Sequence, residues 1–509
     1  PKLEQLQGSR MSRTSAPGAA QTAKVTLGAL AGVVGFLAFV EFTSGILQGY
    51  YTPMLTDIAR HLGIHDADVN WLEGSQLMLS ALVVPAFAKL GDMYGHKRML
   101  LISTALTAAA SLALPFTDSF AVFLVAWALQ GFYVVWLPLE IALIWSRSRG
   151  REGRSLLTAR SAGLLVAALE AGAITGALVG GQLVDTLPLR IVLLVPAICV
   201  VLCFFVILFG VKESPEQTRG KLDLVGLSLI SIALIAFTGG LSLMRLMGPG
   251  SVVPWAVTLL GVLLVVPFAR WELKHPDPLI DVRMFRSPAL APVFLTAGLF
   301  GVSVLGAQAP LSTFARTDPG EVGYGLGTTG FSTSLIMGFY LVAMIVGALL
   351  FPKFARLATP RVTLIFAAGL VGIGYLLFLP FHGSYLQVTI NMVIAGIGSG
   401  ALVASLPAAA AAAAPATQTG VATGLTNSVK TVGGAIASCV FGIALMQGVA
   451  GGASETAGSL TGYVTVWLVC GLTALAAAVL LCFVPRNAFQ DQSSDADSPR
   501  VSAAPEGSA

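Results

Sequence analysis

The sequence predicts an all-α membrane protein with fourteen membrane-crossing helices. Of its 509 residues only 11% are charged and 55% are hydrophobic, whereas soluble domains are about 25% charged. The apolar residues gather into uninterrupted segments of about 20 residues, the length that crosses the hydrocarbon core of a bilayer. Most of the chain is therefore expected to lie in lipid.

Fourteen such segments follow one another along the chain, separated by polar loops. They lie near residues 25–47, 70–90, 98–117, 119–144, 157–184, 189–211, 222–244, 251–271, 288–308, 329–351, 361–380, 385–406, 421–447 and 461–484. Residues 1–24 are expected to form an N-terminal tail, with residues 1–10 as an appended segment ahead of Met11. Residues 485–509 are rich in Ser, Asp, Ala and Pro, which predicts a disordered C-terminal tail.

The basic residues predict the orientation. If the N-terminus lies inside, the inner loops hold most of the Lys and Arg residues of the loops. The outer loops then hold only Arg60, Arg190, Arg245 and Arg316. Because cytoplasmic loops of membrane proteins are enriched in Lys and Arg, both termini are expected to be cytoplasmic and the protein to lie in the cell membrane.

Several functional classes lose support at this stage. The charges are scattered among loops, so nothing points to nucleic acid. The five cysteines lie in apolar segments without metal-ligand spacing, as expected of packing residues. The segment 325–330 fits GxGxxG but follows no predicted strand, and no nucleotide-binding P-loop or hydrolase motif is present. We therefore expect no cofactor, no metal and no enzymatic activity.

A charged turn separates the second and third segments. It reads Gly91-Asp92-Met93-Tyr94-Gly95-His96-Lys97-Arg98. Two glycines and four polar charged or titratable residues are what a tight reversal between two membrane helices at the cytoplasmic face requires. This turn is expected to take part in gating on that side.

Ionisable residues inside membrane segments are costly and mark functional sites by default. Glu41 shares a helical face with Ser44 and Gln48, a polar stripe that predicts the wall of a water-accessible cavity. The alternative is a protonated Glu41 that is hydrogen-bonded within the bundle. Glu73 and Glu140 lie nearer segment ends and are expected at the membrane interface, with lining of the pathway as the alternative.

Glu170 lies on a segment with a ridge of small residues. Gly172, Gly176 and Gly180 recur at four-residue spacing and predict close packing of a second helix. Glu170 points away from this ridge, on the side of Gly181, and either lines the pore or pairs with a basic group.

Lys430 lies near the bilayer centre of its own segment. It either pairs with an intramembrane Glu or extends its ammonium group towards the inner surface.

The chain resembles the major facilitator superfamily. Gly91–Arg98 resembles the signature G-x-x-x-D-R-x-G-R-[KR], retaining Asp92, Gly95 and Lys97, with Arg98 just beyond it. The run from Gly172 to Gly181 is similar to the helix-five antiporter signature G-x-x-x-G-P-x-x-G-G. The stretches 271–285 and 420–434 resemble the fourteen-helix drug:proton antiporter branch.

This resemblance implies two six-helix bundles, 25–211 and 288–484, with an extra helix pair at 222–271. It implies a monomer in which segments one, four, nine and twelve line a central cavity, and segments two, five, ten and thirteen form the bundle interface. The charged turn would hold the bundles together on the cytoplasmic side. Gln130 and Tyr133 of the fourth segment are expected at the substrate.

Three positions depart from the family pattern. Trp127 stands where the fourth helix usually has Arg, and Ala177 replaces the antiporter proline. Glu41 lies about one turn before the usual first-helix acid. Proton coupling is therefore assigned to Glu41 and Glu170 rather than to the family's standard residues, and Trp127 joins the expected substrate contacts.

The functional prediction is a proton-coupled exporter of hydrophobic, cationic small molecules. A membrane carboxyl group can trade a proton for such a substrate, and an aromatic wall favours cations. The alternative is a dedicated transporter of a lipid, a cell-envelope precursor or a self-made metabolite. A receptor, scaffold or embedded enzyme without transport is a third hypothesis, against which the motif set argues.

Overall fold

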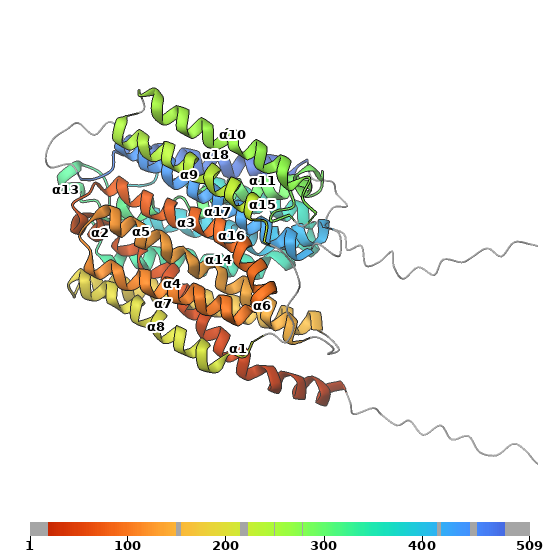
Figure 1. Ribbon diagram of the computed structural model, residues 1–509. Coiled ribbons are helices and arrows are strands. Elements are labelled where there is room, and N and C mark those ends of the chain that lie inside the picture. The colour runs from red at the N-terminus through yellow and green to blue at the C-terminus, as the bar shows by residue number, and fades with distance from the viewer. Residues whose placement is uncertain are drawn as a thin grey trace, which may run out of the picture.

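The computed structural model describes residues 19–148, 154–213, 222–248, 250–276, 278–414, 419–447 and 456–483, and these contain helices but no strand. Most of the two predicted tails lies outside the described residues. The long helices run nearly parallel or antiparallel to one another (Figure 1). They are α1 (Ala19–Tyr50), α3 (Val69–Tyr94), α4 (His96–Ala113), α5 (Phe120–Gln130), α6 (Trp136–Arg147), α7 (Arg154–Val184), α8 (Leu189–Gly210), α9 (Leu224–Met247), α10 (Val252–Glu272), α11 (Ala291–Val304), α14 (Gly330–Leu357), α15 (Pro360–Leu376), α16 (Tyr385–Ala413), α17 (Thr419–Met446) and α18 (Leu460–Leu481).

Shorter helices connect the long ones. They are η1 (Thr52–Met54), α2 (Leu55–Leu62), η2 (Asp66–Asp68), η3 (Leu114–Phe116), η4 (Gly131–Val135), η5 (Val282–Arg286), α12 (Gln308–Arg316) and α13 (Pro319–Val322). Two apolar segments are interrupted: α5, η4 and α6 together span Phe120–Arg147, and α11 and α12 together span Ala291–Arg316.

Every predicted segment contains a helix, and twelve helices among the described residues are long and apolar enough to cross a membrane. The α15 helix, Pro360–Leu376, is apolar but shorter than these. The all-helical membrane fold is thus confirmed, while the number fourteen stays a prediction.

Buried side chains gather into two large hydrophobic cores. One is formed almost entirely by α1 to α8, which we call the first helix group. The other is formed almost entirely by α11 to α18, which we call the second helix group. The α9–α10 pair lies beside them, and a small cluster of Trp71, Leu241, Met244 and Cys439 joins α9 to both groups.

Glycines allow α1 and α7 to pack at very short range. The ridge of Gly172, Gly176 and Gly180 lies against the α1 backbone at Phe42, Ile46 and Tyr50. A Cβ atom at Gly176 would lie 2.9 Å from the Ile46 Cα atom, closer than carbon atoms normally approach. This packing fixes the position of α1, which carries Glu41.

The two ends of the molecule differ. One end carries α2 and α13 and is called the distal end; the other carries the start of α1 (Figure 1). Close contacts between the two helix groups lie in the distal halves of their helices: Gly181 of α7 meets Gly330 and Ser334 of α14, and Gly74 of α3 meets Cys439 of α17.

Candidate functional site

Two carboxyl groups meet in the interior of the first helix group. Glu41 on α1 and Glu140 on α6 are both 0% exposed, and their carboxyl groups lie within electrostatic range of each other. Within the described part of the chain, none of their four carboxyl oxygens has a hydrogen-bond partner. Two buried carboxylates so close to each other repel when both are ionised, and this repulsion favours a proton on one of them.

Glu140 is buried inside the first helix group, while its depth in the membrane stays a prediction. Its helix continues to Arg147, about 10 Å further along the axis. Trp136, Leu139 and Leu143 around it are buried as well. The helix end, rather than Glu140, therefore reaches the surface.

Tyr133 connects this carboxyl pair to a third acidic residue. Its phenol group lies within electrostatic range of Glu41, Glu73 and Tyr51. Glu73 is half-buried on α3. The first helix group thus brings three carboxyl groups and a phenol from four elements towards one region, which sequence spacing alone does not indicate.

Gln130 and Trp127 lie in the interior of the first helix group. The Gln130 amide donates to the Tyr51 hydroxyl at 2.9 Å and to the Ser111 hydroxyl at 2.8 Å. The Trp127 ring contacts the Tyr51 ring, with centroids 4.8 Å apart. Both side chains are almost completely buried, so in this conformation they support Tyr51 and do not line an open cavity.

The polar side chains that follow Glu41 on the same face of α1 differ in burial. Ser44 is buried, one turn from Glu41, whereas Gln48 is exposed. Of the two, only Gln48 is therefore open to a ligand in this conformation.

The side chains of Glu170 and Lys430 come from different helix groups and lie within electrostatic range of each other. Glu170 lies on α7 and Lys430 on α17. Lys430 also lines a small cavity of the second group together with Thr426 and Asn427. Whether Lys430 pairs with Glu170 or extends its ammonium group towards the inner surface stays a prediction.

The charged turn between α3 and α4 is held by an acidic residue that the sequence analysis missed. The Glu213 carboxylate accepts hydrogen bonds from the backbone N–H groups of Lys97 and Arg98, at 2.9 and 3.0 Å. Gly95 has φ +108°, and a Cβ atom there would lie 2.6 Å from a Glu213 oxygen. Glycine is therefore required both by the backbone conformation and by the carboxylate.

Other contacts of this turn also lie within the first helix group. Asp92 pairs with His96 at 3.1 Å, and the Lys97 ammonium group donates to the Leu208 carbonyl at 2.8 Å. The second of these contacts attaches the turn to the end of α8.

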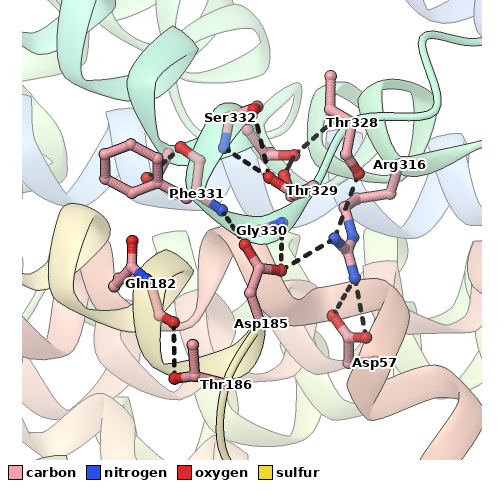
Figure 2. Close-up of polar contacts among 12 residues, drawn as sticks. Asp57, Gln182, Asp185, Thr186, Arg316, Thr328, Thr329, Gly330, Phe331 and Ser332 are labelled. Atoms are coloured by element: carbon pink, nitrogen blue, oxygen red, sulfur yellow. Dashed lines mark hydrogen bonds and ion pairs between the residues drawn. The ribbon is translucent and has the colours of Figure 1, made fainter.

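At the distal end, Arg316 of the second group contacts acidic residues of the first (Figure 2). Its guanidinium donates to both carboxylate oxygens of Asp57, at 2.9 and 2.7 Å, and lies 3.7 Å from Asp185. The sequence analysis missed this cluster because its members lie on three separated loops and short helices.

Burial raises the pKa of the Asp57 carboxyl group, against the opposing effect of Arg316 and Arg60. Two further carboxylates lie within electrostatic range of Asp57: Asp185 and Asp66.

The apolar helices and the two helix groups define a multi-pass membrane protein. The chain belongs to the Major Facilitator Superfamily, whose model matches residues 37–438 and 326–506.

Curated relatives include exporters. The chain is 30% identical to the "Cephamycin export protein CmcT" of Amycolatopsis lactamdurans over 467 residues, covering 89% of each chain. It is 24% identical to the "Multidrug resistance protein Stp" of Mycobacterium tuberculosis (strain ATCC 25618 / H37Rv) over 419 residues, covering 81% of this chain and 74% of the relative.

Solved structures share the fold. The POT family transporter PepTSo aligns with a TM-score of 0.64 at 12% identity, covering 90% of this chain and 98% of that one. The nucleoside transporter NupG aligns with a TM-score of 0.59 at 13% identity, covering 89% and 97%. At these identities the likeness concerns the fold alone.

Proposed function

We propose that this protein is a proton-coupled antiporter that exports hydrophobic, cationic small molecules from the cell. Family membership and the names of the relatives, a cephamycin exporter and a multidrug resistance protein, support export of small molecules. The concentration of basic residues in one set of loops supports a location in the cell membrane with both termini in the cytoplasm. The protein acts as a monomer in this proposal.

The buried pair of Glu41 and Glu140 carries the proposal of proton coupling. A cation that approaches the pair stabilises its ionised form, so binding of the cation releases a proton. When the cation leaves, repulsion between the two carboxylates draws a proton back. Substrate and proton thus exclude each other at one site, which is the condition for antiport.

Alternating access supplies the transport step. In the proposal the two helix groups rock about the central cavity, and with the distal end closed that cavity communicates with the cytoplasm. Gln48 and Tyr133 contact the substrate there, and rearrangement exposes Ser44, Trp127 and Gln130.

The remaining intramembrane charges complete the proposal. Glu73 attracts the cation towards the carboxyl pair. Glu170 takes part in proton coupling through its electrostatic partner Lys430. The charged turn Gly91–Arg98 gates the cytoplasmic side.

Transport in everted membrane vesicles tests the proposal. A pH gradient is expected to drive ethidium movement by the unaltered protein, and a protonophore is expected to abolish it. Glu41→Gln and Glu140→Gln are each expected to lose gradient-driven transport. Glu321→Gln, at an exposed residue of α13, is the matched control and is expected to transport normally. Normal gradient-driven transport by Glu41→Gln would refute the assignment of the proton site.

A further inference from the structure

We propose that Arg316, Asp57 and Asp185 form a latch that holds the distal end closed and must break in every transport cycle. Its three members come from both helix groups: Asp57 from α2, Asp185 from the α7–α8 connection and Arg316 from α12. The inference rests on the proposed function only in assuming that the two groups move relative to each other.

The first part of the latch is the Arg316–Asp57 pair. Both carboxylate oxygens of Asp57 lie within 2.9 Å of one guanidinium nitrogen, and the Arg316 side chain is only 11% exposed. Charge-assisted hydrogen bonds of this length are the stronger kind. A hydrogen bond within the second helix group also fixes the Arg316 side chain, because its second terminal nitrogen donates to the Thr328 carbonyl at 3.2 Å.

The second part is an Asp185 cap on a helix of the other group. The Asp185 carboxylate accepts from the backbone N–H groups of Gly330 and Phe331, at 2.8 and 2.9 Å (Figure 2). These are the first two residues of α14. The N-terminus of a helix has unpaired N–H groups and a partial positive charge, both of which favour a carboxylate.

Arg316 connects the two parts of the latch, because it lies beside both carboxylates. Arg316 lies 3.7 Å from Asp185 while it binds Asp57, so one cation of the second group faces two anions of the first. Opening the distal end separates Arg316 from both carboxylates and uncovers the N-terminus of α14. This electrostatic cost opposes opening.

Two hydrogen bonds to backbone carbonyl groups also join the helix groups at the distal end. The Ser312 hydroxyl donates to the Thr52 carbonyl, and the Asp66 N–H donates to the Thr456 carbonyl at 2.8 Å. Each contact joins one group to the other. Because these are single neutral hydrogen bonds, the latch contributes the larger share of the polar closure.

The chain offers a matched control for the latch. Arg190 binds Asp118 at 3.0 Å, also at the distal end, but α8 and the η3–α5 connection that carry them belong to the same helix group. Opening of the distal end leaves this pair intact. Arg190→Gln removes the same charge from the same end of the molecule without touching the contact between groups.

Distance measurements between spin labels test the latch without any transport assay. Cysteines replace Leu187 and Leu386, which are exposed and lie on different helix groups, in a chain whose five native cysteines are removed. Arg316→Gln is expected to raise the ratio of molecules with an open distal end to those with a closed one by about tenfold or more, because the closed state loses its charge-assisted hydrogen bonds. Arg190→Gln is expected to leave the ratio unchanged.

The double variant Asp57→Asn and Asp185→Asn provides a second route if Arg316→Gln does not fold. It keeps the shape of the latch and removes its negative charges, and it is expected to open the distal end to a similar extent. Unchanged distances in a folded latch variant, or equal opening in Arg190→Gln, would overturn the proposal. Because distances are measured in the absence of substrate and proton gradient, these outcomes are independent of whether the protein exports cations.

Discussion

The close packing of α1 on α7 gives the most direct quantitative prediction. Replacing Gly172 by Ala places a Cβ atom 2.9 Å from the Phe42 carbonyl carbon, with the carbonyl oxygen closer still. Ordinary carbon–carbon contacts lie at about 3.5–4.0 Å, so the helices must separate by about 1 Å. Such overpacking costs about 1–3 kcal/mol. Gly172→Ala is therefore expected to lower the melting temperature of the purified protein.

The same displacement is expected to impair transport. Phe42 follows Glu41 in the chain, so moving α1 away from α7 shifts Glu41 relative to Glu140. Ethidium transport in everted vesicles by Gly172→Ala should therefore fall even when the variant is correctly inserted and folded.

Gly163 on the same helix is the matched control. A Cβ atom there would meet nothing within 4 Å, and Ala stabilises a helix relative to Gly by about 1 kcal/mol. Gly163→Ala is expected to melt at an equal or higher temperature and to transport normally. A Gly172→Ala variant as stable as the unaltered protein, or an equal loss in Gly163→Ala, would refute the reasoning.

Three further predictions concern polar contacts. Gln130→Leu leaves two buried hydroxyl groups without their amide partner, so the melting temperature should fall by the equivalent of about 1–3 kcal/mol; an unchanged temperature would show that this network adds no stability. Glu213→Ala removes the carboxylate that accepts from two N–H groups at the start of α4, so amide hydrogen exchange in that turn should accelerate, and equal protection would contradict the capping role. Burial raises the pKa of Asp57, and only its ionised form pairs with Arg316. As the pH falls, Asp57 therefore becomes neutral at a higher pH than an ordinary aspartate, and the label distances across the distal end should report more opening; in Asp57→Asn this part of the pH response should disappear.

The helices could be predicted from the sequence because each one is a local property of an apolar segment. The break between α5 and α6 could not, because the run from residue 119 to 144 is continuously apolar around Gly131. A tertiary contact is present at η4: Ser80 of α3 donates to the Gly131 carbonyl at 3.0 Å. A contact between residues so far apart in the chain leaves no trace in local hydropathy.

Part of the candidate site could also be predicted, because it depends on local properties of single helices. Periodicity placed Glu41 on a polar face of its helix, and the cost of intramembrane charge marked Glu140 and Lys430. Which charges meet depends on how helices pack, so the approach of Glu41 to Glu140 and that of Glu170 to Lys430 appear only in the structure. Trp127 was expected at the substrate because of its position in the family pattern, whereas the structure packs it against Tyr51.

The latch members were the least predictable. Asp57, Asp185 and Arg316 lie outside the long helices, and no spacing rule connects them. Residues in loops and short connecting helices follow no repeating pattern. Whether they meet depends on how the two helix groups pack together. Their role becomes visible once the two helix groups are placed side by side.

Proton release on cation binding reports directly whether the Glu41–Glu140 pair exchanges a proton for a cation. Purified protein in weakly buffered solution is mixed with ethidium, and a pH-sensitive dye reports protons set free, with Glu321→Gln as the control. The account predicts proton release by the unaltered protein and by Glu321→Gln, and its loss in both Glu41→Gln and Glu140→Gln. Saturable ethidium binding without proton release by the unaltered protein would contradict the exchange of cation for proton at the Glu41–Glu140 pair.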